Sequence, residues 1–321
     1  MSKHVLDQKT ASISLDTIDA LLNSANIQTR HHENSISFDG CIGHTRVAIS
    51  SSNHKLPDGR EISQIVRIAS LLPDISIVFD ELAQCLLNIT ASNSAVMVDH
   101  EGKPRVNSRI SLYSGESQDV AHIYTGVIFL TAVMHTNAVQ AALASASGLE
   151  IPKPPPPPES SREDVWDVES FYRTTALLRN TGAFANGDAE GLTAEFPWDP
   201  GAVSAFKNLT HGTAERTSLL RIERSEHPCL GNGLSCRLDL PLQLTDSDAF
   251  KHAVALNRTE CEAIDGPPFM GAWTSKPGSG RPTFVSFWPN YLSHAIGVEM
   301  IASWHAARAH RTASWGRSQK L

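Results

Sequence analysis

The chain has 321 residues, a hydrophobic fraction of 41% and a formal net charge of −7. This composition is that of a globular protein, and the length accommodates two domains of ordinary size. Neither half is basic, which disfavours nucleic acid and membrane as partners, and five cysteines without CxxC spacing favour reduced thiols in a cytoplasmic protein.

Apolar spacing in the first half predicts a helix, three strands, a helix, two strands and a helix. These elements cover residues 14–24, 35–39, 45–50, 62–72, 77–90, 95–98, 106–113 and 117–140. In the helix over 77–90, one apolar side is predicted to carry Val78, Leu82, Cys85, Leu86 and Ile89. The apolar window of the last helix, 123–134, is too short to cross a bilayer.

Five consecutive prolines, Pro154 to Pro158, divide the chain near its middle. Proline fixes φ and lacks a backbone N–H, so neither a helix nor a ladder-bonded strand can continue through the run. The run predicts a stiff polyproline II spacer, and a ligand for a proline-binding module is the alternative. The predicted domains are therefore residues 1–148 and 164–321, each with its own core, joined by a linker over 149–163.

The second half repeats the same order of elements. They cover residues 164–180, 192–196, 218–224, 234–240, 245–264, 269–274, 282–287 and 290–307, with a tight turn at 231–233. Asn290 or Ser293 is the predicted cap of the last helix. The middle helices of the two halves align as Cys85-Leu86-Leu87-Asn88 with Val254-Ala255-Leu256-Asn257. The chain is therefore expected to repeat one architecture, α+β with two layers in each half.

Residues at helix starts support these boundaries. Ser14 and Ser117 can cap helices, and Thr245 followed by Asp248 has the spacing of a capping box. Side-chain alternation along 234–240 leaves a polar sheet face, which is predicted to be the contact between the halves. That face carries Ser235, Arg237 and Asp239.

This order of elements resembles the type III secretion chaperone-like fold, and in particular the YbjN-like bacterial proteins. Short motifs in both halves carry the resemblance: Pro57-Asp58-Gly59-Arg60, Leu86-Leu87-Asn88, Asp99-His100-Glu101-Gly102, Gly231-Asn232-Gly233-Leu234, Asp239-Leu240-Pro241, Ala255-Leu256-Asn257, Gly271-Ala272-Trp273 and Phe287-Trp288-Pro289-Asn290. The resemblance implies two tandem domains that form a pseudo-dimer and bind a polypeptide partner.

Two common catalytic motifs do not occur in the sequence. It has neither a phosphate-binding Walker loop nor a Gly-x-Ser-x-Gly nucleophile elbow. His31-His32-Glu33 and Asp99-His100-Glu101 are the densest groups of metal-ligand residue types, but each is expected to be an ordinary polar loop. No catalytic residue, cofactor site or metal site is therefore predicted.

Tryptophans gather near the C-terminus, at 273, 288, 304 and 315. Large aromatic side chains either fill a core or anchor an interface. Core packing is predicted for Trp273 and Trp304, and partner binding for Trp288, Tyr291 and Trp315.

These observations favour a non-catalytic bacterial protein that binds a polypeptide partner as a chaperone, adaptor or regulator, and that is a monomer or a homodimer. Two alternatives stay open, namely an enzyme with its site in the cleft between the halves and a structural oligomer subunit.

Overall fold

A computed structural model describes residues 11–41, 43–72, 80–91, 93–98, 101–148, 165–198, 217–293 and 296–318, with side chains to 314 in the last range. The predicted linker over 149–163 lies outside the described residues.

The first half forms sheet A, an antiparallel sheet with the strand order β1-β2-β3-β4-β6-β5 among the described residues. Its strands are β1 (Arg30–His32), β2 (Ser35–Asp39), β3 (His44–Lys55), β4 (Glu61–Leu71), β5 (Ala95–Val98) and β6 (Pro104–Tyr113). Its helices are α1 (Leu15–Ser24), α2 (Glu81–Ala91) and a long closing helix made of α3 (Gln118–Met134), the π-helical turn η1 (His135–Val139) and α4 (Gln140–Ala146).

The second half forms sheet B, with the order β11-β12-β10-β9-β8-β7 among the described residues. Its strands are β7 (Phe184–Gly187), β8 (Gly191–Pro197), β9 (Thr217–His227), β10 (Gly231–Asp239), β11 (Ala272–Thr274) and β12 (Thr283–Pro289). Its helices are α5 (Val168–Asn180), α7 (Asp246–Glu262), the 3₁₀ turn η5 (Asn290–Leu292) and α8 (Val298–Ser318).

The two halves share one order of elements, but each sheet has six strands among the described residues rather than the five predicted. The additional strands are β1 and β7, which lie at sheet edges. All three residues of β1 are exposed, and they include His31 and His32, which were predicted to lie in a loop. A short edge strand with one neighbour need not bury alternate side chains, so it shows no alternating apolar pattern in the sequence.

Two predicted boundaries in the second half are wrong. Residues 231–233 belong to β10 rather than to a turn, and a Cβ on Gly233 would lie 2.3 Å from the backbone oxygen of Trp288 on the paired strand. Glycine therefore permits close strand contact here. Asn290 lies in η5, and the last helix starts only at Val298.

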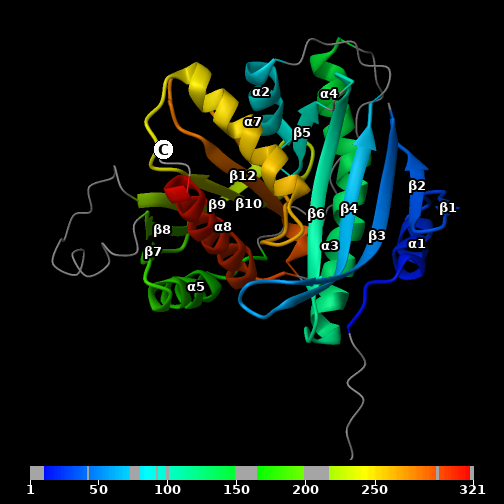
Figure 1. The fold of residues 1–321 in the computed structure, drawn as a ribbon, viewed down its shortest axis with the longest axis horizontal. Helices are drawn as coiled ribbons and strands as arrows, with labels where there is room; N and C mark the ends of the chain where they lie inside the picture. Colours follow the sequence, from blue (N-terminus) through cyan, green and yellow to red (C-terminus); the bar gives the residue numbers. More distant parts are fainter. Residues whose placement is uncertain are drawn as a thin grey trace, which may run out of the picture.

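The long closing helix over 118–146 contains a segment long and apolar enough to cross a membrane by length and composition. However, 72% of that window is buried inside the protein, and in Figure 1 the helix runs along sheet A. Its apolar character is explained by packing as a core helix.

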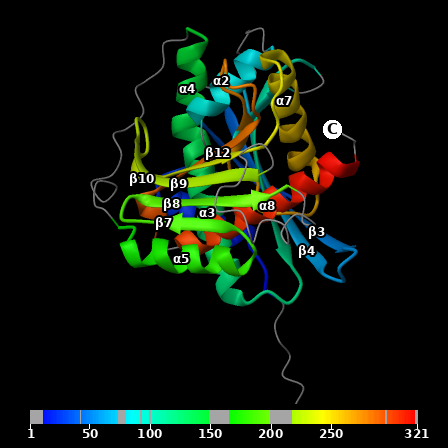
Figure 2. The same cartoon turned by 90° about the vertical axis from the view of Figure 1, so that its left-hand side faces the viewer.

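The two halves pack directly on each other around the middle helices. Figures 1 and 2 both show α2 beside α7, and α2 also contacts β11 of the other sheet. We call the whole contact between the two halves, which centres on α2, α7, β5 and β11, the junction. The polar strand face was predicted to make the contact, but its Asp239 pairs with Arg221 and Arg237 of the same sheet.

Buried residues of both halves belong to one continuous apolar cluster among the described residues. Cys85 of α2 and Phe284 of β12 are both members, and the ring of Tyr124 of α3 lies 6.1 Å from the ring of Trp304 of α8. The core is therefore shared across the junction rather than divided between the halves.

Candidate functional site

Two asparagines define the equivalent positions of the halves. The side-chain oxygen of Asn88 accepts the backbone N–H of Val96 at 2.7 Å, and that of Asn257 accepts the backbone N–H of Trp273 at 2.7 Å. The predicted alignment of the middle helices is thus confirmed. Both side-chain amides also donate to the backbone oxygen of Trp273, so they tie α2 and α7 to the same strand.

The closing helix of each half carries a buried histidine that bonds to a serine, on β6 in the first half and on β12 in the second. His135 Nε2 lies 3.1 Å from Ser108 Oγ, and His305 Nε2 lies 3.1 Å from Ser286 Oγ. Burial lowers the pKa of each imidazole to about 3. Both rings are therefore neutral at pH 7, which makes them polar core contacts rather than acid–base groups poised near neutral pH.

In the junction, each half also bonds to the part of β6 or β12 in the other half that extends beyond its pairing with β5 or β11. Arg109 and Phe269 pair through both backbone N–H groups, at 3.1 and 2.7 Å. At the corresponding place on β12, the backbone N–H of Phe287 donates to Asn93 Oδ1 at 3.1 Å. Arg109 and Phe287 each lie two residues beyond the last residue paired with β5 or β11, so they are equivalent positions.

Charged side chains are buried on the Arg109 side of the junction. Glu260 accepts Arg308 Nε at 2.9 Å and Trp273 Nε1 at 2.8 Å. Arg109 donates to Ser111 Oγ at 2.6 Å and to the backbone oxygens of Glu260 and Pro267. Burial lowers the pKa of Arg109 to about 10, so its guanidinium stays cationic at pH 7.

A cavity of about 300 Å³ opens beside this charged layer, and we call it the junction cavity. Residues from both halves line it: Arg60, Ser111, Tyr113, Tyr124, Asp265, Gly266, Pro267, Pro268, Trp304, Ala307 and Arg311. Ser111 and Pro267 are hydrogen-bond partners of Arg109, and Pro268 accepts from Arg308. One wall of the cavity therefore lies directly on the buried guanidiniums.

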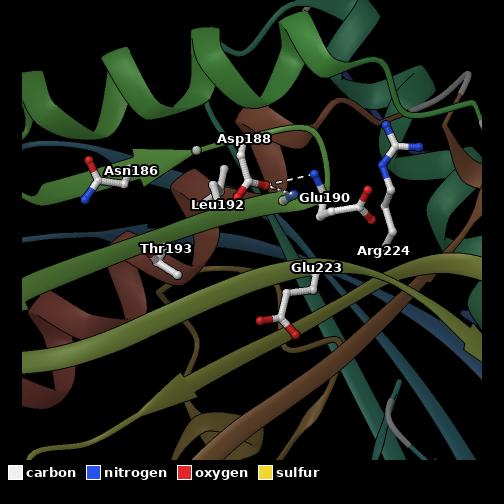
Figure 3. Close-up of a pocket in the computed structure, with 9 residues that line it drawn as sticks. Asn186, Asp188, Glu190, Leu192, Thr193, Glu223 and Arg224 are labelled. Atoms are coloured by element: carbon white, nitrogen blue, oxygen red, sulfur yellow. Dashed lines mark hydrogen bonds between the residues drawn. The ribbon is translucent and has the colours of Figure 1, made fainter.

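A second cavity, of about 360 Å³, lies at the turn between β7 and β8 and is shown in Figure 3. Asp188 accepts the backbone N–H groups of Glu190 and Gly191 at 2.8 and 3.1 Å, so its carboxylate holds the turn. Figure 3 shows the carboxylates of Glu190 and Glu223 pointing in different directions.

Metal-ligand residue types do not gather into a site in the described part of the chain. Among the described residues, His, Cys, Asp and Glu form no group of three that could hold a metal. Of the two groups that the sequence singles out, His31 and His32 bond to Asp19 and Ser37. Asp99 and His100 lie outside the described residues.

A third cavity, of about 270 Å³, borders Trp166, Arg224 and Asn290. Trp166 Nε1 donates to Asn290 Oδ1 at 2.9 Å, and Arg224 donates to the backbone oxygen of Trp166. These contacts connect the start of the second half to sheet B.

The predicted partner-binding residues lie in different environments. Trp288 is only 2% exposed, donates to Ser286 Oγ and packs on Trp304, so it is a core residue and not a docking anchor. Tyr291 is half-buried, and burial raises the pKa of its hydroxyl. The backbone of Trp315 continues α8, and its side chain lies outside the described residues. The predicted core positions of Trp273 and Trp304 are confirmed.

An exposed apolar stripe runs along α2, although its residues were predicted to share one side of the helix with Cys85, which is buried. Leu82, Leu86 and Ile89 are 38%, 47% and 39% exposed, whereas Cys85 and Asn88 are buried in the junction. Sequence reasoning missed this surface because the hydrogen bond from Asn88 to Trp273, which orients the helix, is a long-range contact. We call the three exposed residues the α2 stripe.

A scan against models of protein families, a search of the curated proteins and a search of the solved structures find no significant match to this chain.

Proposed function

We propose that this chain is a non-catalytic, cytoplasmic bacterial protein that binds a polypeptide partner through the α2 stripe, as a chaperone, adaptor or regulator. The proposal includes a tandem of YbjN-like domains, which the repeated element order and the junction support.

The α2 stripe is the observation that carries this proposal. Its residues are spaced i, i+4 and i+7, so they lie on one side of the helix. The alignment of Asn88 with Asn257 places Lys251, Ala255 and Arg258 at the equivalent positions of α7. The architecture therefore accepts two charged residues and an alanine there, and three large apolar side chains on α2 point to an interaction surface.

The spacing favours an amphipathic helix of the partner as the bound segment. Helices that dock through an apolar face use anchors at i, i+3 or i+4, and i+7. The α2 stripe has the same spacing, so the apolar face of a partner helix can lie along it over about two turns.

The test replaces the α2 stripe with the residues of α7, as Leu82→Lys, Leu86→Ala and Ile89→Arg in one variant. The control variant removes three exposed apolar side chains of α5 by Val168→Lys, Tyr172→Ala and Leu177→Arg. Affinity capture from the native cytosol with mass spectrometry should recover a partner with the wild type and the control but not with the α2 variant. Equal capture by both variants, with unchanged melting temperatures, would refute the α2 stripe as the binding surface.

A further inference from the structure

The two sides of the junction occupy equivalent positions but differ in chemistry. Arg109 on β6 corresponds to Phe287 on β12. The alignments of the paired asparagines and histidines make Glu260 equivalent to Ala91 and Arg308 equivalent to Ala138. An apolar cluster fills the second side, made of Met134, Ala138, Leu230 and Phe287. Equivalent positions on the two sides of the junction are thus filled with apolar side chains on one side and with buried charges on the other.

Burying these charges is not required to hold the halves together. A buried ion pair is commonly no more stabilising than apolar side chains of similar volume, and apolar side chains fill the other side of this junction. Among the described residues of this layer, the buried guanidiniums of Arg109 and Arg308 lie beside one buried carboxylate, Glu260. The layer beside the junction cavity therefore has an excess of positive charge.

The loop of the second half that borders this cavity is longer than the equivalent loop of the first half. Between α7 and β11 the loop covers residues 263–271, whereas only residues 92–94 separate α2 from β5. Gly266 in the long loop has φ +107°, and a Cβ there would lie 2.3 Å from Arg311 Nη1. Glycine allows Arg311 to lie against the loop, where it pairs with Asp265 at 2.9 Å.

The lining of the cavity combines two cations, Arg60 and Arg311, and the carboxylate of Asp265 with aromatic rings. The Arg60 guanidinium lies 4.8 Å from the centre of the Tyr113 ring and pairs with the exposed Asp58. Trp304 and Tyr124 contribute two further rings, 6.1 Å apart. Such a lining offers a charged group and a flat apolar surface to one small molecule.

We propose that the junction cavity binds a small organic anion, with its phosphate or carboxylate group beside Arg60 and Arg311 and its flat apolar body against Trp304. A volume of about 300 Å³ is at the lower end of the range for small-molecule sites. Arginine suits both phosphate and carboxylate because its planar guanidinium can donate two parallel hydrogen bonds. This inference goes beyond polypeptide binding by the α2 stripe and does not depend on it.

The probes are phenyl phosphate, benzoate and neutral benzyl alcohol, each titrated into the full-length protein by isothermal calorimetry. The wild type should bind at least one of the two anions saturably at a single site, and more tightly than it binds the neutral compound. The comparison of phenyl phosphate with benzoate distinguishes a phosphate-bearing from a carboxylate-bearing ligand.

Two variants with matched controls locate the binding. Arg60→Gln should weaken anion binding about tenfold or more, as expected for the loss of a charged hydrogen bond. Arg30→Gln removes a similarly exposed arginine paired with Asp39 and should leave binding unchanged. Ala307→Leu should obstruct the cavity from the exposed side of α8, and Ser303→Leu, one turn earlier on that helix, should not.

The proposal is supported if an anion binds saturably and if, of the four variants, only Arg60→Gln and Ala307→Leu weaken its binding. It is overturned if neither anion binds the wild type saturably. It is also overturned if each variant and its control have equal effects while all four keep the wild-type melting temperature.

Discussion

At the residue scale, the buried histidines make the protein sensitive to acid. The pKa of His135 and of His305 is about 3 in the folded chain, against 6.5 for an unperturbed histidine. The unfolded state therefore binds more protons between these values, so stability is complete above pH 6.5 and falls as the pH falls. The loss at pH 5 is about 2 kcal/mol per histidine. The lowered pKa values of His227 and His310 act in the same direction.

Denaturant unfolding at pH 7 and pH 5 measures this loss. The variant with His31→Ala and His32→Ala is the control, because these residues lie in exposed β1 and bond to Asp19 and Ser37. It should keep both the stability and the acid sensitivity of the wild type. Equal stability of the wild type at the two pH values would contradict the prediction.

Glu260 is the residue whose negative charge compensates the buried guanidiniums. Glu260→Gln keeps the shape of the side chain but leaves the buried guanidiniums of Arg109 and Arg308 without a neighbouring carboxylate among the described buried residues. Breaking a buried ion pair costs about 3–5 kcal/mol. Asp265→Asn breaks the partly exposed pair with Arg311 and should cost at most about 1 kcal/mol. Denaturant unfolding compares the two variants, and equal losses would disprove this difference.

At the element scale, the contributions of two predicted N-cap residues can be compared. Thr245 Oγ1 accepts the backbone N–H of Asp248 at 3.2 Å, so it caps α7 as its sequence spacing predicts. Ser14 has the N-cap position of α1, but within the described residues its side chain makes no capping hydrogen bond. Thr245→Ala should therefore cost about 1 kcal/mol in thermal or denaturant unfolding, and Ser14→Ala should cost much less. A loss for Ser14→Ala as large as that for Thr245→Ala would contradict the predicted difference.

For the whole molecule, the shared core changes the expectation that the halves have separate cores. Thr274 Oγ1 donates to the backbone oxygen of Cys85 at 2.7 Å, and Asn93 accepts from the backbone of Phe287. Fragments 1–148 and 164–321 would each leave such groups and part of the common core without their partners. Each fragment alone should lack the cooperative melt of the intact chain, as followed by circular dichroism. Two cooperative melts at the temperature of the intact chain would argue for independent cores.

Small-angle scattering on the intact chain tests the packing of the halves in solution. The junction predicts a single compact particle, because α2 and α7 are in direct contact. The comparison variant carries Asn88→Ala and Asn257→Ala, which removes the hydrogen bonds to Trp273 and should weaken the junction. Two resolved lobes in the wild type would be incompatible with the junction.

The sequence by itself determined most of the elements and their repetition, because helix and strand periods, caps and proline breaks are local properties. It did not predict β1 and β7, whose few residues gain their strand geometry only by pairing with β2 and β8. These pairings involve short edge strands, and their residues do not alternate between apolar and polar.

Which side of α2 faces inward was decided only by the tertiary structure. The side of α2 with Asn88 and Cys85 faces β11, where the Asn88 amide donates to Trp273 and the backbone oxygen of Cys85 accepts from Thr274. This leaves the α2 stripe exposed. The tertiary structure likewise brought Arg60, Tyr124 and Arg311 to one cavity from distant parts of the chain. Contacts between residues so far apart leave no periodic signal in the sequence, since periodicity reports only which residues of one element share a face.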